Sequence, residues 1–465
     1  MKLPAYPRTK PSGVEWLGDV PEHWAVKRLK TSAICWVSNV DKVPAEDELP
    51  VRLCNYTDVY YNDHITPDME LMETTATADE IRRFGLRVGD VVITKDSEEW
   101  SDIAVPALVK KTAPDLVCGY HLAIIRSKAK VLSGDYLLRA FQSCAVNQQF
   151  QIAASGVTRY GLPKSSIGDA WIPLPEPAEQ QAIAAYLDRE TGRLDRLVGR
   201  KRELIERLKE KRTALISRTV TRGLPPASAR AAGLPEDPPL KPSGLDWLGD
   251  IPKHWEVKPV KYVARIGNGS TPNRDNAAYW EEGDYPWLNS SSVNRETITD
   301  SEDFVTALAL RECHLPKIKP PAVLIGITGQ GRTRGMASTL LFEATINQHV
   351  AYVKPSPGKA DVGFLRRVFD MAYEFLRSES DGGGSTKGAI TCEQIGTMQI
   401  PVPPLPEQAA IAAYLDLETA KLDALVGKVE AAVERLQEYR TALITAAVTG
   451  KIDVRQKPQI NTIAP

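Results

Sequence analysis

Two arginines within a glycine-rich stretch are the residues of this chain best suited to bind a ligand. Residues 329–335 read GQGRTRG. Glycines let the backbone approach another molecule closely, and the planar guanidinium of arginine forms paired hydrogen bonds with a guanine edge or a phosphate. The pattern therefore indicates that Gln330, Arg332 and Arg334 contact nucleic acid. A solvated hairpin tip is the alternative interpretation.

Residues arranged for catalysis do not stand out. Residues 237–240 read DPPL, which is the nearest approach to the D-P-P-aromatic motif of amino-methyltransferases, but the fourth residue is aliphatic and the segment lies in a proline-rich linker. Residues 326–331 read GITGQG and lack both the Lys-Ser/Thr of a phosphate-binding loop and the G-x-G-x-x-G spacing. Six histidines offer little material for a catalytic set. The sequence therefore predicts a non-catalytic protein.

Composition sets the broad class. The chain has 465 residues, of which 43% are hydrophobic and 25% charged, as in soluble proteins of several domains. The net charge of −1 means that any basic surface must be local. Six well-separated cysteines without a C-x-x-C pair argue against zinc or a disulfide framework and fit a reducing compartment. With no signal peptide and no run of 18 apolar residues, we expect a cytoplasmic protein without a membrane partner.

A long charged segment occurs twice. Residues 171–223 and 399–451 align at a shift of 228 positions, so that IAAYLD at 183–188 returns at 411–416 and TALI at 213–216 returns at 441–444. A second repeat, at a shift of 231, relates residues 10–24 to residues 241–255 and includes the sequence W-L-G-D and a His-Trp pair. The chain therefore has two similar halves.

The repeated His-Trp pairs admit two interpretations. His23 and Trp24 belong to a Pro- and Gly-punctuated segment that reads as an irregular peptide pinned by aromatic anchors. The alternative is a ligand site or base-stacking site. We favour the anchoring role, because His254 and Trp255 have the same place relative to the second helical segment.

The repeated segments read as helices. Pro177 and Pro406, each followed by an acidic residue near the first turn, are helix-start signals. We expect a short helix that ends near Asp188 and a longer one capped by Thr191, with Thr419 in the same role in the second copy. Near-heptad apolar positions predict a seam that needs a partner helix, most economically the other copy packed antiparallel. The seam residues are Leu194, Leu197, Leu204, Leu208 and Leu215, and Leu422, Leu425, Val429, Val433, Leu436 and Leu443.

Between these segments lie two variable domains that share a frame, with His121 falling on His349 at the shift of 228. Apolar runs predict strands over 88–94, 116–125, 322–328 and 344–353, and helices over 136–150 and 362–377.

The doubled W-L-G-D-[IV]-P-x-H-W segments, the doubled helix starts and the variable domains between them resemble the DNA-specificity subunit of a type I restriction–modification system, over essentially the whole chain. The resemblance implies a non-catalytic subunit that reads a split, asymmetric DNA target with one recognition domain per half-site. It also implies docking of two modification (methyltransferase) subunits on the helices and attachment of restriction subunits, which are ATP-dependent translocating nucleases. S-adenosylmethionine, ATP and Mg²⁺ would belong to those partners, and this chain would bind no cofactor.

The implied fold is α+β: two mixed α/β target-recognition domains separated by two long antiparallel helices, with a pseudo-two-fold internal repeat. The expected divisions are residues 1–170 (N-terminal peptide and recognition domain 1), 171–223 (helical spacer 1), 224–261 (linker and repeated W-L-G-D segment), 262–398 (recognition domain 2) and 399–465 (helical spacer 2 and tail).

Further DNA-contacting residues follow from the shared frame. A Gly/Ser loop that ends in a cation occurs in both halves just before the helical module, and in the family this region resembles a DNA-facing loop. It supplies Thr158, Arg159 and Tyr160 in the first half and Ser385, Thr386 and Lys387 in the second. Lys95 and Lys164, and Asn347, Gln348 and His349, are weaker candidates; His121 and His349 have the alternative role of satisfied core histidines.

Two rival functions remain. One is a self-contained methyltransferase or nuclease, which methyl transfer by the purified chain would reveal. The other is a scaffold whose recognition domains have lost DNA binding, which DNA binding in complex with the modification subunit would exclude.

Overall fold

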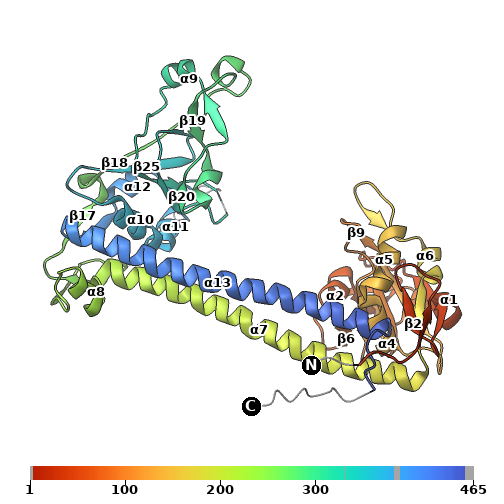
Figure 1. Ribbon diagram of the computed structural model, residues 1–465. Helices are drawn as coiled ribbons and strands as arrows, with labels where there is room; N and C mark the ends of the chain where they lie inside the picture. The colour runs from red at the N-terminus through yellow and green to blue at the C-terminus, as the bar shows by residue number, and fades with distance from the viewer. Residues whose placement is uncertain (1–3, 330, 382–387, 456–465) are drawn as a thin grey trace, which may run out of the picture. The chain divides into compact units, whose positions relative to one another are not determined.

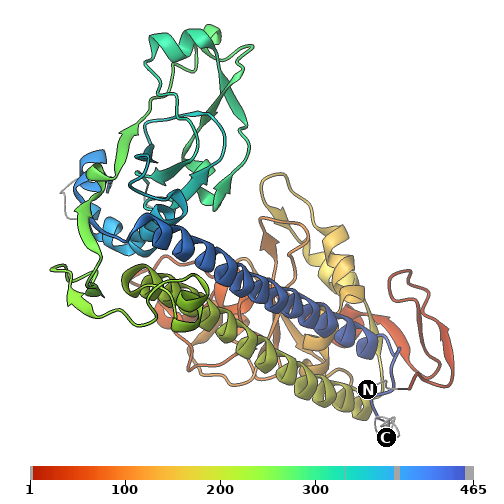
Figure 2. The same cartoon turned by 60° about the vertical axis from the view of Figure 1, so that its left-hand side comes forward.

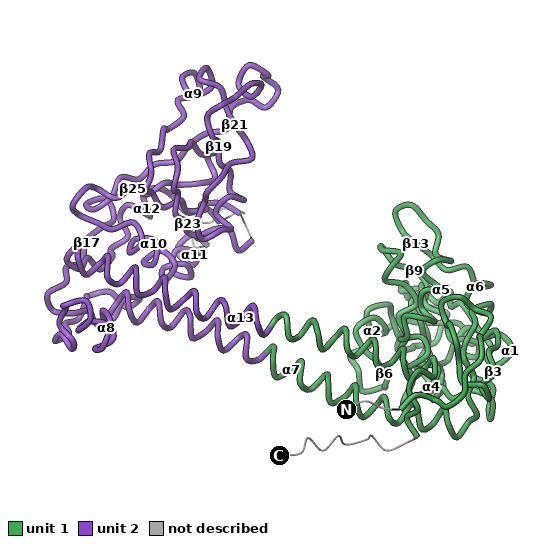
Figure 3. Tube along the Cα trace, viewed as in Figure 1, with its two compact units in different colours: residues 1–202, 430–465 green, residues 203–429 purple. Residues whose placement is uncertain are grey.

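The computed structural model describes residues 4–329, 331–381 and 388–455. The chain forms two compact units, coloured separately in Figure 3. Unit 1 comprises residues 1–202 and 430–465, and unit 2 comprises residues 203–429. Gln330 and Ser385 to Lys387, all predicted DNA contacts, lie outside the described residues.

Each unit is built on a five-stranded sheet with the same topology. In unit 1 the order is β4 (Ala33–Val37), β12 (Leu122–Ser127), β8 (Val91–Thr94), β10 (Pro106–Val109) and β6 (His64–Ile65). In unit 2 it is β18 (Ala264–Asn268), β25 (Val350–Pro355), β22 (Ala322–Gly326), β23 (Ala337–Leu340) and β20 (Thr297–Ile298). The first four strands of each sheet pair antiparallel, whereas the last pair is parallel.

A second, three-stranded sheet also recurs. It consists of β11 (Leu116–Cys118), β5 (Leu49–Cys54) and β7 (Met72–Ala76) in unit 1, and of β24 (Thr345–Ile346), β19 (Tyr285–Leu288) and β21 (Asp303–Val305) in unit 2. In both units the first pair is parallel and the second antiparallel. The internal repeat therefore extends to the strand directions.

Alternation along the central strand explains the layers of unit 1. Val91 and Ile93 of β8 face the core shared with helices α4 (Gly134–Gln142) and α5 (Cys144–Ala153), whereas Val92 faces a separate core beneath the small sheet. Successive side chains of a strand point to opposite faces, so β8 is buried on both sides. In unit 2, Val323 and Ile325 face α10 (Val362–Met371), and Leu324 faces the other core.

Several predicted elements are interrupted. The helix predicted over 136–150 is wrong as a single element, because Ser143 is extended and separates α4 from α5. The helix predicted over 362–377 likewise divides at Ala372 into α10 and α11 (Tyr373–Asp381). The predicted strand over 116–125 breaks at His121, whose φ of +69° turns the chain into the left-handed region. The strand predicted over 344–353 divides into β24 and β25.

The charged segments form two continuous helices, α7 (Pro177–Arg222) and α13 (Leu405–Val448). The expected break near Asp188 is wrong. Thr191 and Thr419 are buried inside the helices, and the Thr419 hydroxyl donates to the Leu415 carbonyl at 2.7 Å instead of capping a new helix. Both predicted helix starts are confirmed to within two residues.

The helices run antiparallel within each unit (Figures 1 and 2). In unit 1 the segment 177–202 lies against 430–448, with Asp195 bonded to Arg440; in unit 2 Arg212 is bonded to Asp423. The predicted seam is partly wrong. Val198 and Ile205, each 8% exposed, occupy it in place of Leu197 and Leu204, which are 41% and 44% exposed, and Leu425 also faces outward.

The His-Trp pairs anchor the start of each long helix. Trp24 and Trp255 are fully buried. His23 Nε2 lies 2.9 Å from Glu179 Oε2 on α7, and His254 Nε2 lies 2.9 Å from Glu407 Oε2 on α13. The anchoring interpretation is therefore confirmed.

Candidate nucleic-acid interface

A charged cluster in unit 1 forms around Asp96 in β9 (Asp96–Ser97). Lys95 Nζ lies 2.8 Å from Asp96 Oδ1, and His121 Nδ1 lies 2.5 Å from Asp96 Oδ2. Arg159 Nη1 is 3.5 Å from His121 Nε2. Burial acts to raise the pKa of the Asp96 carboxyl, but the hydrogen bonds from Lys95 and His121 hold that pKa below its ordinary value. The cluster is an ordered set of cations around one carboxylate.

The predicted loop of unit 1 joins this cluster through strand pairing. Tyr160 and Gly161 form β13, which pairs antiparallel with β9 and places Tyr160 opposite Ser97. Thr158 and Arg159 are exposed. A glycine is required at Gly156, since a Cβ there would lie 1.9 Å from the Arg159 carbonyl oxygen. Lys95 therefore lies in one region with Thr158, Arg159 and Tyr160, from which it is distant in sequence.

Lys164 belongs elsewhere in unit 1. It begins α6 (Lys164–Asp169), which packs against β4. Burial raises the pKa of the Cys35 thiol to about 11, and the nearby Lys164 ammonium opposes that rise. Lys164 is exposed and lies near β4. It is not among the residues that bond to one another in the Asp96 cluster.

Unit 2 repeats the backbone frame with different side chains. The amide of Ile327 donates to the His349 carbonyl at 3.0 Å, as Lys95 donates to His121 at 2.8 Å. The backbone of Thr328 forms an antiparallel β-bridge with Ala389, as Asp96 pairs with Gly161 in unit 1. In place of a charged cluster, the Thr328 hydroxyl lies 2.8 Å from His349 Nδ1.

A chain of hydrogen bonds continues from this histidine. Gln348 Nε2 lies 3.2 Å from His349 Nε2, and the Thr271 hydroxyl donates to Gln348 Oε1 at 2.5 Å. Asn347 is 5% exposed and accepts from the His349 amide, so it supports the turn. Unit 2 therefore presents amide, hydroxyl and imidazole groups where unit 1 presents charges.

The glycine-rich stretch lies beside α11. Arg377 Nη1 donates to the carbonyls of Gly331 and Arg334 at 2.8 and 2.9 Å, and the Tyr373 hydroxyl donates to the Arg332 carbonyl at 2.8 Å. These bonds hold the backbone and leave the Arg332 side chain exposed. We expected both Arg332 and Arg334 to face a ligand, and this prediction is wrong for Arg334. Its side chain is 4% exposed, which argues against direct contact with DNA.

Three residues of these clusters were not predicted from the sequence. Asp96 adjoins the predicted Lys95 and follows a buried strand, which was an available signal. Thr271 lies 77 positions before its partner Gln348, and no sequence pattern joins them. Tyr56, whose hydroxyl interacts with Ser97 and lies near Arg159, gave no signal beyond its aromatic ring.

Within the described ranges, no helix is both long and apolar enough to cross a membrane. Nor do the described residues include a group of three or more His, Cys, Asp or Glu side chains arranged to hold a metal ion.

Comparison with known proteins agrees with this architecture. Residues 252–435 match the family model described as the Type I restriction modification DNA specificity domain. A protein of Methanocaldococcus jannaschii described as the type I restriction enzyme MjaX specificity subunit is 23% identical over 94% of this chain and 96% of its own length. The MjaIX specificity subunit of the same organism is 31% identical over 36% of this chain and 38% of its own length.

Solved structures share the fold. A chain from a study of complex assembly and conformational transition of the type I R-M system superposes with a TM-score of 0.69 and 18% identity, over 93% of this chain and 99% of that chain. The HsdS subunit from Thermoanaerobacter tengcongensis superposes with a TM-score of 0.51 and 18% identity, over 93% of this chain and 98% of that chain. The predicted class, two mixed α/β domains with two long helices, is confirmed.

The class of protein follows from these matches. Residues 252–435 match the type I DNA specificity domain, and the two units share one sheet topology. The resemblance seen in the sequence is confirmed: the chain is similar, over nearly its whole length, to proteins described as type I restriction enzyme specificity subunits.

Proposed function

We propose that this chain is the non-catalytic specificity subunit of a type I restriction–modification complex and reads a split, asymmetric DNA target with one recognition domain per half-site. One observation carries the proposal. The same backbone frame occurs in both units, and it holds Lys95, Asp96 and Arg159 in one but Thr328 and Gln348 in the other. Equivalent positions with different hydrogen-bonding groups suit two readers of different base sequences.

Each unit supplies its own set of contacts. In unit 1 we assign Lys95, Thr158, Arg159 and Tyr160 to DNA, and Lys164 to a more distant phosphate. In unit 2 we assign Arg332 and Gln348, together with Gln330, Ser385, Thr386 and Lys387. Cations positioned on loops contact phosphates or guanine, while amides and hydroxyls read adenine and other base edges.

The partners are also part of the proposal. Two modification subunits would dock on the long helices, and restriction subunits would join that core. Methyl transfer would use S-adenosylmethionine on the modification subunits, and cleavage would use ATP and Mg²⁺ on the restriction subunits. We place the complex in the cytoplasm, on chromosomal and invading double-stranded DNA.

A map of methylated adenines at base resolution, in host DNA with and without this gene, tests the function. Loss of one split motif, with two short defined halves around a fixed gap, is the expected result. An unchanged map favours a scaffold that has lost recognition. Methyl transfer by the purified chain alone would instead identify a self-contained enzyme.

A further inference from the structure

In each unit, charged side chains from both long helices and from the recognition domain form a chain of ion pairs. Its two ends lie on the same long helix, so that the helix backbone completes a ring. In unit 1, Arg440 of α13 donates through Nε to Asp195 Oδ1 on α7 at 3.0 Å, and through Nη2 to Asp63 Oδ2 at 3.0 Å. Asp63 immediately precedes β6 of the recognition domain. One guanidinium therefore joins two helices and a domain.

A buried arginine closes the unit 1 ring. Arg139 of α4 has a side chain that is 3% exposed; its Nη1 lies 3.5 Å from Asp63 Oδ2 and its Nη2 lies 2.7 Å from Asp188 Oδ1 on α7. We call Asp63, Arg139, Asp188, Asp195 and Arg440 the unit 1 ring. It contacts α7 at two places two turns apart.

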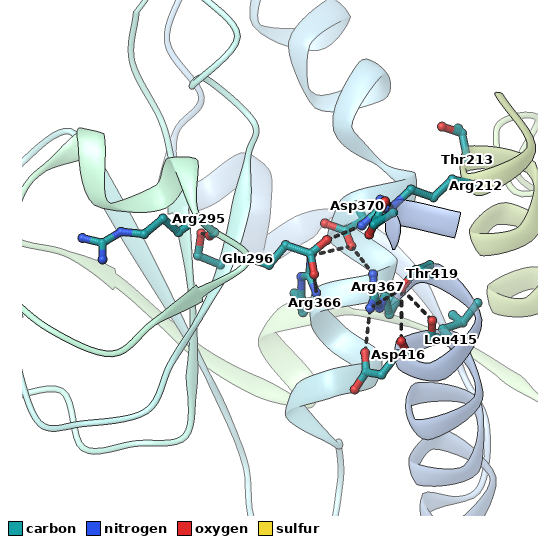
Figure 4. A network of polar contacts seen from close by, with 12 residues as sticks. Arg212, Thr213, Arg295, Glu296, Arg366, Arg367, Asp370, Leu415, Asp416 and Thr419 are labelled. Carbon is teal, nitrogen blue, oxygen red and sulfur yellow. Dashed lines mark hydrogen bonds and ion pairs between the residues drawn. The ribbon is translucent and has the colours of Figure 1, made fainter. Parts of the chain in front are cut away.

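Unit 2 contains the same ring with the helices exchanged (Figure 4). Here Arg212 of α7 takes the place of Arg440: its Nε lies 3.0 Å from Asp423 Oδ1 on α13, and it also bonds to Glu296 before β20. Arg367 Nη2 lies 2.6 Å from Asp416 Oδ1 on α13, as Arg139 reaches Asp188.

The unit 2 ring closes through an added pair. Arg366 Nη2 lies 3.0 Å from Glu296 Oε1 and 3.3 Å from Asp370 Oδ2, and Arg367 Nη1 lies 3.3 Å from the same Asp370 oxygen. We call Arg212, Glu296, Arg366, Arg367, Asp370, Asp416 and Asp423 the unit 2 ring. Arg212 and Arg440, Arg367 and Arg139, Asp416 and Asp188, and Asp423 and Asp195 are all 228 positions apart.

The geometry of the rings favours orientation over stability. Exposed ion pairs contribute little to folding, and buried pairs are costly to desolvate. Solvent reaches the rings through neighbouring cavities of about 470 Å³ in unit 1 and 310 Å³ in unit 2. A planar guanidinium that bonds in two directions nevertheless restricts the angle between the groups that it joins. Each ring does so for three segments at once.

We propose that each ring is a positioning device that holds its recognition domain at one orientation on the two helix segments of its unit, and thereby sets the gap at which the subunit accepts its two half-sites. The proposal rests on the proposed function. Arg212 and Arg440 are positioning residues, because they act through the orientation of the domain and not by touching DNA.

The test uses the complex with its modification subunits, carrying Arg212→Gln or Arg440→Gln. Methylation is measured on duplexes with the native gap and with the gap changed by one base pair, and on duplexes with one base changed in either half-site. We expect the preference for the native gap to fall on the order of ten-fold or more, while base preference within each half-site stays unchanged. Arg218→Gln, an exposed cation on α7 outside the ring, is the matched control and should behave as wild type.

Two further variants separate orientation from folding. Glu296→Gln removes the ion pair between Arg212 and the recognition domain, and Asp423→Asn removes the ion pair between the helices. Each should relax the gap preference, and both carry the test if Arg212→Gln folds poorly. A lower melting temperature with an intact gap preference in all four variants would overturn the proposal. Absence of methylation by the wild-type complex at every gap would instead refute the proposed function.

Discussion

Units 1 and 2 share strand order, strand directions and anchoring histidines, yet their side chains differ in the proposed DNA-contacting regions. At equivalent backbone positions, unit 1 has Lys95 and Asp96, and unit 2 has Ile327 and Thr328. The shared contacts are those that join each domain to the long helices: Gln180 accepts from the Ser133 amide as Gln408 accepts from the Asp361 amide, at 2.9 and 2.8 Å. The contacts that attach each domain to the long helices are therefore shared, whereas the proposed DNA contacts differ, so that one set can change while the other stays.

The largest expected difference between the units concerns their buried arginines. Burial raises the pKa of the Asp370 carboxyl, and the charges of Arg366 and Arg367 oppose that rise. Arg367→Ala removes one of these two arginines. Arg139→Ala leaves the neutral Gln142 at the equivalent position. We expect losses of about 4 kcal/mol for Arg367→Ala and about 2 kcal/mol for Arg139→Ala, since breaking a buried pair is costly. Hydrogen exchange of α10 and α4 measures each unit separately; equal losses would contradict the reasoning.

The glycines after the long helices should differ next. A Cβ on Gly450, at a φ of +71°, would lie 2.2 Å from Pro21 Cδ, whereas a Cβ on Gly223, at +83°, would have its nearest contact at 3.6 Å. Gly450→Ala therefore combines a clash with backbone strain, and we expect about 3 kcal/mol of destabilisation, against about 1 kcal/mol for Gly223→Ala. Thermal unfolding of the two variants measures the difference. Similar melting temperatures would show that Pro21 moves aside at little cost.

A smaller effect should separate the two readers. Arg159→Ala is expected to weaken binding by about 1–2 kcal/mol and to relax preference in one half-site only, and Arg332→Ala in the other only. Affinity is measured on targets with single-base changes in each half, at one fixed salt concentration. Relaxation of both halves by one variant would break the assignment of one unit to one half-site.

The smallest effect is a pH dependence confined to unit 1. Because the pKa of Asp96 is held below its ordinary value, its contribution to stability is present above the ordinary carboxyl pKa and is lost as the pH falls through the folded-state pKa. Asp96→Asn should therefore destabilise unit 1 at neutral pH and have less effect in acid. Thr328→Val, at the equivalent position, should show the same effect at both values. Urea titrations at pH 7 and pH 3 measure both variants.

Elements defined by composition and repetition were predictable from the sequence, whereas details set by packing were not. The helix starts, predicted at Pro177 and Pro406 and found at Pro177 and Leu405, and the buried tryptophans follow from local signals and from the repeat. The proximity of Lys95 to Arg159 and Tyr160 is set by strand pairing and was not predicted. The division at Ser143 was not predicted either, because a serine suits both a helix interior and a cap. Helix continuity through Thr191 was also not predicted, because a threonine that could cap the start of a new helix lies buried inside a continuous one.

The site residues that were not predicted correctly are also explained by packing. Arg334 carries the charge expected of a DNA contact, yet its neighbours bury it. Thr271 reaches Gln348 through a fold that brings distant loops together. Local sequence indicates the chemistry that a residue offers, and only the surrounding packing decides whether it faces outward.

The exchange of helix segments between the units bears on synthesis of the chain. Unit 2 is one continuous segment, residues 203–429, but unit 1 needs residues 430–448 to complete its core, where Leu443 and Ile444 pack with Trp24. Domains generally fold as units during synthesis, the N-terminal domain first. Unit 1, although most of it is translated first, instead completes its core last. Its core stays incomplete until residues 430–448 have been synthesised.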